Sequence, residues 1–105
     1  MAKGQYLAEF ELYVAAAVAR LGDDAYGMTI RREIENRCGR AVAIGAVYTT
    51  LDRLSRKGLV TFRVSAPRPV QGGRARKHVK LTAAGHDALA HSGAMLKRIL
   101  PGWAR

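Results

Sequence analysis

The amino-acid sequence predicts a mainly α-helical fold with one small β-hairpin, an α+β class, and three observations support this. Apolar residues recur every three or four positions over most of residues 5–58, which is the spacing of helices with one buried face. Two short stretches of strict alternation then flank a loop rich in glycine and proline, as in a hairpin. A last run with helical spacing follows Thr82.

The chain has 105 residues, a length that predicts one small domain with a modest core. Its net charge is +10, from 18 Lys and Arg against 8 Asp and Glu. Residues 52–80 carry nine basic residues against Asp52 alone, so this quarter supplies +8 of that charge. Concentrated positive charge predicts a polyanionic partner, either nucleic acid, an acidic membrane surface or an acidic protein.

Cellular location is predicted from two features of the sequence. Cys38 is the only cysteine, so no intramolecular disulfide can form, and we expect it to be a small buried residue near a helix end. The apolar run at residues 13–19 is too short to span a membrane and lacks the cationic start of a signal peptide. We therefore expect a cytoplasmic protein without a membrane partner.

Two helices are predicted at residues 5–21 and 25–37, separated by Gly22-Asp23-Asp24. Gly27, beside Tyr26 in the second helix, is expected to allow close approach by another backbone. Arg32 is expected in salt links along its helix, and Arg31 is left open as a phosphate contact. Helical spacing defines the expected buried faces, which comprise Leu7, Phe10, Val14, Ala17, Val18 and Leu21 in the first helix and Tyr26, Ile30, Ile34 and Cys38 in the second.

The stretch at residues 44–58 predicts a helix with two unlike faces, ended by Gly58. One face is an apolar stripe made of Ile44, Val47, Tyr48, Leu51 and Leu54. The other is small, hydroxylated or cationic and consists of Gly45, Ala46, Thr49, Arg53, Arg56 and Lys57. Two helices joined by a short glycine-containing link, with the second as the DNA reader, form a helix-turn-helix. An ordinary amphipathic surface helix is the alternative.

A hairpin is predicted directly after this helix, with strands at residues 59–65 and 76–81. Its position is that of the wing in a winged helix-turn-helix, which would occupy residues 1–81. Gly72 and Gly73 at the loop tip would let the backbone approach DNA closely, and Arg74, Arg76 and Lys77 would contact phosphate or the minor groove. A solvated hairpin without a ligand is the alternative.

Residues 82–105 are predicted to form a C-terminal dimerisation helix, capped by Thr82 and packed as one compact unit with the rest. An apolar and small-residue stripe would form the dimer seam, which comprises Gly85, Ala88, Leu89, Ser92, Met95, Leu96 and Ile99. The alternative is that this stripe covers the core of its own chain.

Four stretches occur together in a specific order, AYGMTIRREIE, GAVYTTLDRLSRKGLV, GGRARK and LTAAG. With these, the chain resembles the PadR family of bacterial transcriptional regulators, in its short form with a single C-terminal helix. The resemblance implies a homodimer that binds double-stranded DNA at an inverted repeat, usually as a repressor. By this resemblance, the reader helix meets DNA through Gly45, Tyr48, Thr49 and Arg53, and the wing through Gly72, Gly73 and Arg74.

The sequence also departs from the family pattern. Ala43 replaces a serine that often caps the reader helix, so this cap is weaker by roughly 1 kcal/mol. His78-Val79 replaces the usual aromatic residues at the base of the wing, and the short last helix leaves little room for a large effector pocket. Family members can bind small aromatic effectors at the dimer centre, where Met95 and Trp103 would be the candidates here.

No enzymatic activity, metal site or cofactor is predicted. The three histidines and one cysteine form no metal-binding signature, and neither a G-x-S-x-G nor a Walker A spacing occurs. The predicted function is sequence-specific DNA binding that regulates transcription. The alternative is a ligand-sensing or protein-interaction winged-helix module with only non-specific affinity for DNA.

Overall fold

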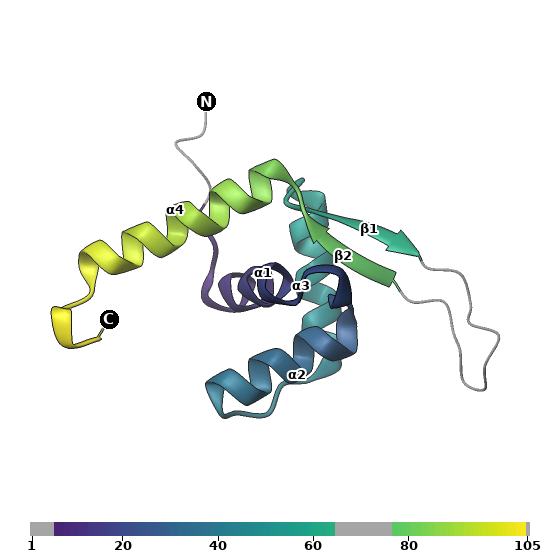
Figure 1. The fold of residues 1–105 in the computed structure, drawn as a ribbon, viewed down its shortest axis with the longest axis horizontal. Helices are drawn as coiled ribbons and strands as arrows, with labels where there is room; N and C mark the ends of the chain where they lie inside the picture. Colours follow the sequence, from purple (N-terminus) through teal and green to yellow (C-terminus); the bar gives the residue numbers. More distant parts are fainter. Residues whose placement is uncertain (1–5, 65–76, 105) are drawn as a thin grey trace.

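A computed structural model of the chain describes residues 6–64 and 77–104. Within these residues it confirms the predicted fold class, because four α-helices surround a core that one antiparallel hairpin completes (Figure 1). The elements in chain order are α1 Glu9–Leu21, the 3-10 helix η1 Gly22–Asp24, α2 Gly27–Cys38, α3 Ile44–Arg56, β1 Val60–Val64, β2 Lys77–Leu81, α4 Ala83–Ile99 and the 3-10 helix η2 Gly102–Ala104.

Two helix starts differ from the sequence prediction, and side-chain caps explain both. α1 begins at Glu9 rather than at residue 5, because the Glu11 carboxylate accepts a hydrogen bond from the Ala8 amide at 2.9 Å and stops the helix there. α2 begins at Gly27 rather than at residue 25. The Thr29 hydroxyl accepts a hydrogen bond from the Tyr26 amide at 3.0 Å, which caps α2 in the same way.

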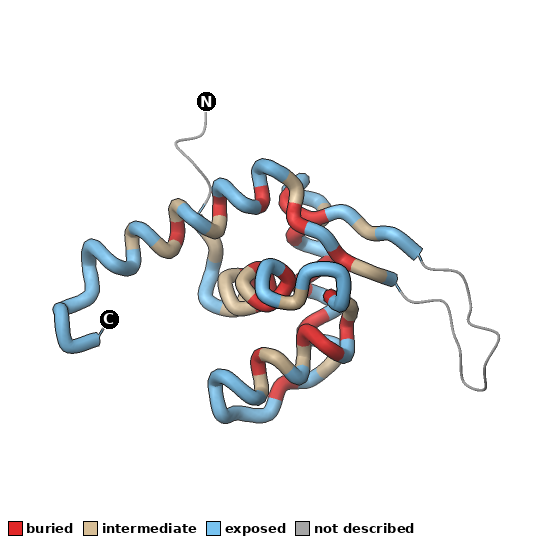
Figure 2. The backbone as a smooth tube through the Cα atoms, in the orientation of Figure 1, coloured by how far each residue is buried: buried red, intermediate tan, exposed pale blue. Residues whose placement is uncertain are grey.

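The core lies between α1, α2, α3 and the hairpin, where buried segments face one another (Figure 2). Helical spacing predicted most of it correctly. Its buried aliphatic side chains come from α1, α2, α3, the turn after α3 and both strands, and they include Val14, Val18, Ile30, Ile34, Val47, Leu51, Leu54, Leu59, Val60, Val79 and Leu81. Burial of such a set is the main stabilising contribution to a domain of this size.

The hairpin is fixed to the body at its base. Its register pairs Val60 with Leu81 and Phe62 with Val79, and these four side chains lie in the core or pack against it. Val64 follows the same alternation but is 66% exposed, because the hairpin extends beyond the helices there. The Val79 amide donates to the Ala25 carbonyl at 2.8 Å, so β2 is also joined to the segment before α2.

The turn between α3 and the hairpin is hydrogen-bonded to the start of α4. Gly58 adopts a left-handed conformation with φ of 76°, which ends α3 as predicted. The Thr82 hydroxyl accepts a hydrogen bond from the Gly85 amide at 3.0 Å, the predicted cap of α4, and donates to the Gly58 carbonyl at 2.7 Å. A Cβ on Gly85 would lie 2.0 Å from the Leu59 carbonyl oxygen, so only glycine fits there.

Cys38 is exposed, which contradicts the prediction that it is buried. It is the last residue of α2, in a turn that extends past the core; Ile34, one turn earlier, is the last buried residue of that helix. Over the described part of the chain, no helix combines the length and apolar character needed to cross a bilayer.

Candidate nucleic-acid interface

α3 is held to the core by one face and presents the other to solvent. Val47, Leu51 and Leu54 are almost fully buried and fix its position against α1 and α2. The opposite face is exposed and consists of Gly45, Ala46, Thr49, Arg53 and Arg56, five of the residues predicted to contact DNA. A Cβ on Gly45 would meet no atom within 4 Å, so close approach by a partner is unobstructed there. No side chain caps the helix at Ala43, as predicted.

Tyr48 lies at the junction of α3 and α2, although the sequence placed it within the buried stripe. Its side chain is 51% exposed. Its ring packs over Gly27 so closely that a Cβ on Gly27 would lie 2.5 Å from the Tyr48 hydroxyl oxygen. A close approach at Gly27 was expected from another backbone, but the group that makes it is the side chain of Tyr48. The phenol hydroxyl is thereby held near the first turn of α2.

The three cations at the end of α3 have different partners. Arg56 forms an ion pair with Asp52 on its own helix at 2.9 Å, and Lys57 forms one with Glu11 of α1 at 2.9 Å. Arg53 has no ion pair with any residue that the structure describes. Arg53 is thus available to a phosphate or base, whereas Arg56 has an exposed partner that a phosphate would have to displace.

Glu11 is a functional residue that the sequence did not reveal, because a single acid in the first turn of a helix is usually solvated. It is only 2% exposed and joins α1 to the end of α3. Burial by itself raises the pKa of Glu11, but hydrogen bonds from Lys57 and the Ala8 amide outweigh it and hold the pKa below its ordinary value. The carboxylate is therefore ionised at neutral pH and anchors the end of α3 to α1.

Of the neighbouring arginines Arg31 and Arg32 on α2, Arg31 forms a salt link and Arg32, for which one was predicted, forms none among the described residues. Arg31, which was left open as a phosphate contact, lies 3.5 Å from Glu35, whose carboxylate also accepts the Val42 amide at 2.9 Å. That backbone hydrogen bond, with the nearby Arg31, lowers the pKa of Glu35. Arg32, which was assigned to salt links, is exposed and forms no ion pair within the described residues.

Glu33, the neighbour of Arg32 in the chain, is occupied by two other arginines. It pairs with Arg37 on its own helix and with Arg20 of α1, the latter at 3.1 Å. The Arg37 hydrogen bond is the main cause that lowers the pKa of Glu33. Arg32 therefore adds a free positive charge beside the helix-turn-helix.

The hairpin contributes three described cations. Arg63 and Lys80 are exposed, and the ammonium of Lys77 lies 4.4 Å from the centre of the Phe62 ring, a cation–π contact. The predicted wing residues Gly72, Gly73, Arg74 and Arg76 lie outside the described residues. The base of the wing is thus basic.

The predicted dimer seam divides into two parts. Three small residues, Gly85, Ala88 and Ser92, are buried against their own chain, and the Ser92 hydroxyl accepts a hydrogen bond from the Leu7 amide at 3.1 Å. For these three residues the structure therefore agrees with the alternative given above, in which the small-residue stripe covers the core of its own chain. Ile99 is 78% exposed, and most of the last two turns of α4 has no intrachain cover (Figure 2). Only this distal part is open to a partner.

Within residues 6–64 and 77–104, no three His, Cys, Asp or Glu side chains are grouped so as to hold a metal ion. The exposed face of α3, with Thr49, Arg53 and Arg56, instead offers a hydroxyl and cations, which suit hydrogen bonds and charge contacts to phosphates and base edges.

Comparison with known proteins agrees with this geometry. The family model described as the transcriptional regulator PadR-like family matches residues 17–91, which include α2, α3, the hairpin and the first half of α4. No curated protein sequence shows a significant match.

Several solved structures share the fold. A PadR family transcription regulator from Clostridium difficile aligns with a TM-score of 0.73 and 23% identity, over 88% of this chain and 91% of that chain. A PadR-like transcription factor from Bacteroides fragilis aligns with a TM-score of 0.68 and 24% identity, over 86% and 82% of the two chains. RosR from Halobacterium salinarum aligns with a TM-score of 0.63 and 29% identity, over 90% and 78%.

Proposed function

Because this chain belongs to the PadR-like family of transcriptional regulators, we propose that it binds an inverted-repeat operator as a homodimer and represses transcription from the promoter that contains it. α3 would be the reader helix and the hairpin the wing. Such a regulator would act where the chromosomal DNA is, in the cytoplasm. It needs no cofactor and no catalytic group.

The observation that carries the proposal is the exposed face of α3. A major groove about 12 Å wide admits a helix, and small residues such as Gly45 and Ala46 let the backbone approach the base edges. Arg53 is exposed on this face and is not engaged by a described carboxylate. Tyr48 beside α2, with Arg32, would contact phosphates on the flank and set the orientation of the helix.

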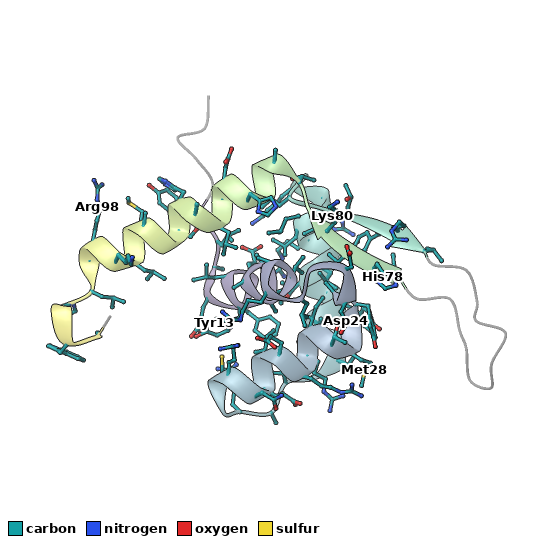
Figure 3. The ribbon with its side chains drawn as sticks, viewed as in Figure 1. Tyr13, Asp24, Met28, His78, Lys80 and Arg98 are labelled. Atoms are coloured by element: carbon teal, nitrogen blue, oxygen red, sulfur yellow. The ribbon has the colours of Figure 1, made fainter. Side chains whose placement is uncertain are left out.

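The homodimer is supported by an uncovered apolar groove between α1 and the distal part of α4. The groove has a volume of about 690 Å³, and it is lined by Tyr6, Leu7, Leu12, Tyr13, Met95, Leu96 and Ile99 among others. Figure 3 labels Tyr13 on α1 and Arg98 on α4, which mark its two sides. Exposed apolar surface of this kind costs free energy in water, and a second copy of α4 would cover it.

A gel shift with DNA from upstream of the protein's own gene, repeated at several salt concentrations, tests the proposal. We expect a discrete complex that survives competitor DNA and protects an inverted repeat in a footprint. Binding that ignores sequence and disappears steeply with salt would leave only the electrostatic attraction and overturn the specific-regulator assignment.

The second candidate is a ligand-sensing module with only non-specific DNA affinity. It is favoured by the aromatic side chains at the groove, Tyr6 and Tyr13, and by Trp103, which is 88% exposed. Titration of small aromatic compounds against Trp103 fluorescence tests it. No change with any compound that relieves repression would exclude this role for Trp103.

A further inference from the structure

A buried carboxylate joins α1 to the C-terminal end of α3. The carboxylate of Glu11 accepts hydrogen bonds from the Lys57 ammonium at 2.9 Å and from the Ala8 amide at 2.9 Å. The positive charge of Arg53, which is exposed on α3, also attracts this carboxylate. Glu11 therefore holds the end of α3 that carries the cations of the proposed DNA-binding face.

α1 and α3 are also connected through α4. The Ser92 hydroxyl of α4 accepts a hydrogen bond from the Leu7 amide before α1 at 3.1 Å, and the Thr82 hydroxyl before α4 donates to the Gly58 carbonyl after α3 at 2.7 Å. Together with the ion pair, these contacts close a triangle of three helices, in which α1 packs against both of the others (Figure 1). A triangle keeps its angles only while all three sides are present. The ion pair thus helps to fix the direction of α3 relative to α4.

The first turns of α1 also border the apolar groove proposed as the dimer contact. Leu7, Leu12 and Tyr13 line that groove, whereas Glu11 in the same part of the helix is buried. One short stretch of α1 therefore contacts the proposed dimer surface through some of its side chains and the end of α3 through another. In a dimer, the position of each reader helix would depend on this stretch.

An ion pair suits this role because its geometry is demanding. Replacement of a buried ion pair by apolar residues of similar volume is often neutral or stabilising, so charge is not required here for stability as such. Apolar packing is not directional and tolerates small rotations of a helix. A buried carboxylate that loses its ammonium partner is costly, however, so the pair of Glu11 and Lys57 opposes such rotations.

Small changes in the direction of α3 matter in a protein that reads two half-sites. A tilt of about 10° about one end moves the other end of this 13-residue helix by about 3 Å. This displacement is close to the rise of one base pair, which is about 3.4 Å along the DNA axis. A dimer whose reader helices are held at a fixed angle would therefore distinguish operators whose half-sites differ in separation by a single base pair.

We propose that Glu11 and Lys57 are positioning residues that set the direction of the reader helix relative to α4, and thereby the half-site spacing that the dimer accepts; the spacing part rests on the proposed function. Neither residue has to touch a base for this role. Loss of the pair leaves the exposed face of α3 intact. It should therefore lower discrimination between spacings more than it lowers affinity for a single half-site.

The direction of α3 is tested on the full chain without DNA. Residual dipolar couplings of the backbone amides of residues 44–56 and 83–99 report the angle between α3 and α4 in solution. We expect Glu11→Gln to change this angle or to average it, although it retains an oxygen that can accept the Ala8 amide. Glu33→Gln is the matched control, because it breaks an exposed ion pair between α1 and α2, and it should leave the angle unchanged. An unchanged angle in Glu11→Gln would overturn the positioning role.

The spacing part is tested by fluorescence anisotropy with the operator found in the gel shift, with the same operator lengthened or shortened by one base pair between its half-sites, and with one half-site alone. The original protein should prefer the natural spacing by about tenfold, a discrimination comparable to that of one mismatched base pair. In Glu11→Gln and in Lys57→Gln most of this preference should be lost, with half-site affinity retained. A smaller fraction of folded protein scales every affinity by the same factor, so it cannot change this ratio.

The two charges should act as one unit. The double variant Glu11→Gln/Lys57→Gln should lose no more spacing discrimination than either single variant, because each of these already removes the pair. Additive losses, or an equal preference in the original protein and both single variants, would refute the spacing role. An equal loss in Glu33→Gln would show that discrimination does not depend on this pair. Failure to find any operator would instead count against the proposed function, and the angle between α3 and α4 would then decide the positioning role.

Discussion

The Tyr48 ring lies directly over Gly27, so the reader helix is seated on the first turn of α2 through a contact that leaves no space for a methyl group. Because the nearest atoms belong to the far end of a side chain, the tyrosine can move away if that space is filled. The contact thus controls where the Tyr48 hydroxyl points more than how stable the fold is.

Gly27→Ala should therefore displace Tyr48 and weaken operator binding, with only a small change in stability. In a Tyr48→Ala background the same substitution should stabilise the protein by up to about 1 kcal/mol, because alanine favours helix over glycine. Urea unfolding and anisotropy on all four proteins form a double-mutant cycle. Additive effects on DNA binding would show that the two residues are not coupled.

Gly85→Ala should be strongly destabilising, by about 3 kcal/mol or more, because the added Cβ would meet the backbone oxygen of Leu59 and the backbone cannot yield cheaply. Gly93→Ala is the matched control on the same helix, since a Cβ there meets nothing within 4 Å. It should stabilise by up to about 1 kcal/mol. Similar urea midpoints for the two variants would contradict the docking of α4 on the α3–β1 turn.

Glu11→Gln should destabilise the protein by about 1–2 kcal/mol at neutral pH, since it leaves Lys57 without its buried partner. The pKa of Glu11 is lowered from an ordinary value of 4.5, so the ionised group stabilises the folded state. That contribution is fully present above the ordinary value and lost as pH falls through the lowered pKa.

The pH dependence of unfolding separates this role from a simple packing defect. The difference in unfolding free energy between the original protein and Glu11→Gln should shrink as pH is lowered below about 4.5. Asp52→Asn, which breaks an exposed ion pair, is the control and should change stability by at most about 0.5 kcal/mol. A difference that stays constant with pH would rule out the charge as its cause.

Arg53→Ala should weaken operator binding more than Arg56→Ala, because Arg56 already has Asp52 as a partner. If Arg53 contacts phosphate, the affinity should fall by a similar factor on all DNA sequences. The slope of log affinity against log salt concentration should then decrease in magnitude by about one. If it reads a guanine, discrimination at one base pair should fall by roughly 1–3 kcal/mol. Arg74→Ala is expected to weaken binding through the wing. Unchanged binding after Arg53→Ala and Arg74→Ala would contradict the proposed interface.

Ile99→Asp should yield a monomer that binds a half-site weakly, because a charge would enter the proposed seam at its most exposed apolar position. Ala90→Asp, at an exposed site that does not line the groove, should remain dimeric. Sedimentation velocity measures both. A monomeric original protein, or a dimeric Ile99→Asp, would refute the proposed interface.

Local pattern alone determined the order and type of the elements. The helical spacing of Val14, Val18, Ile30 and Ile34 predicted the buried faces, and alternation around a Gly-Pro loop predicted the hairpin. Gly58 and Thr82 marked helix ends through backbone conformation and capping, which depend on neighbours in the chain. Each of these features depends on residues close together in the chain, so it can be predicted from the sequence alone.

Only the tertiary structure decided which groups become partners. Periodicity reports that a position faces inward or outward and says nothing of the atom across from it. Glu11 is buried because Lys57, far along the chain, comes to it, and Arg53 is the α3 cation left without a described partner. The small residues of α4, which resembled a seam for a second chain, are small because Leu59 and Leu7 of their own chain lie against them. The candidate DNA-binding face is thus visible in the sequence, whereas the groups that position it are set by contacts between distant elements.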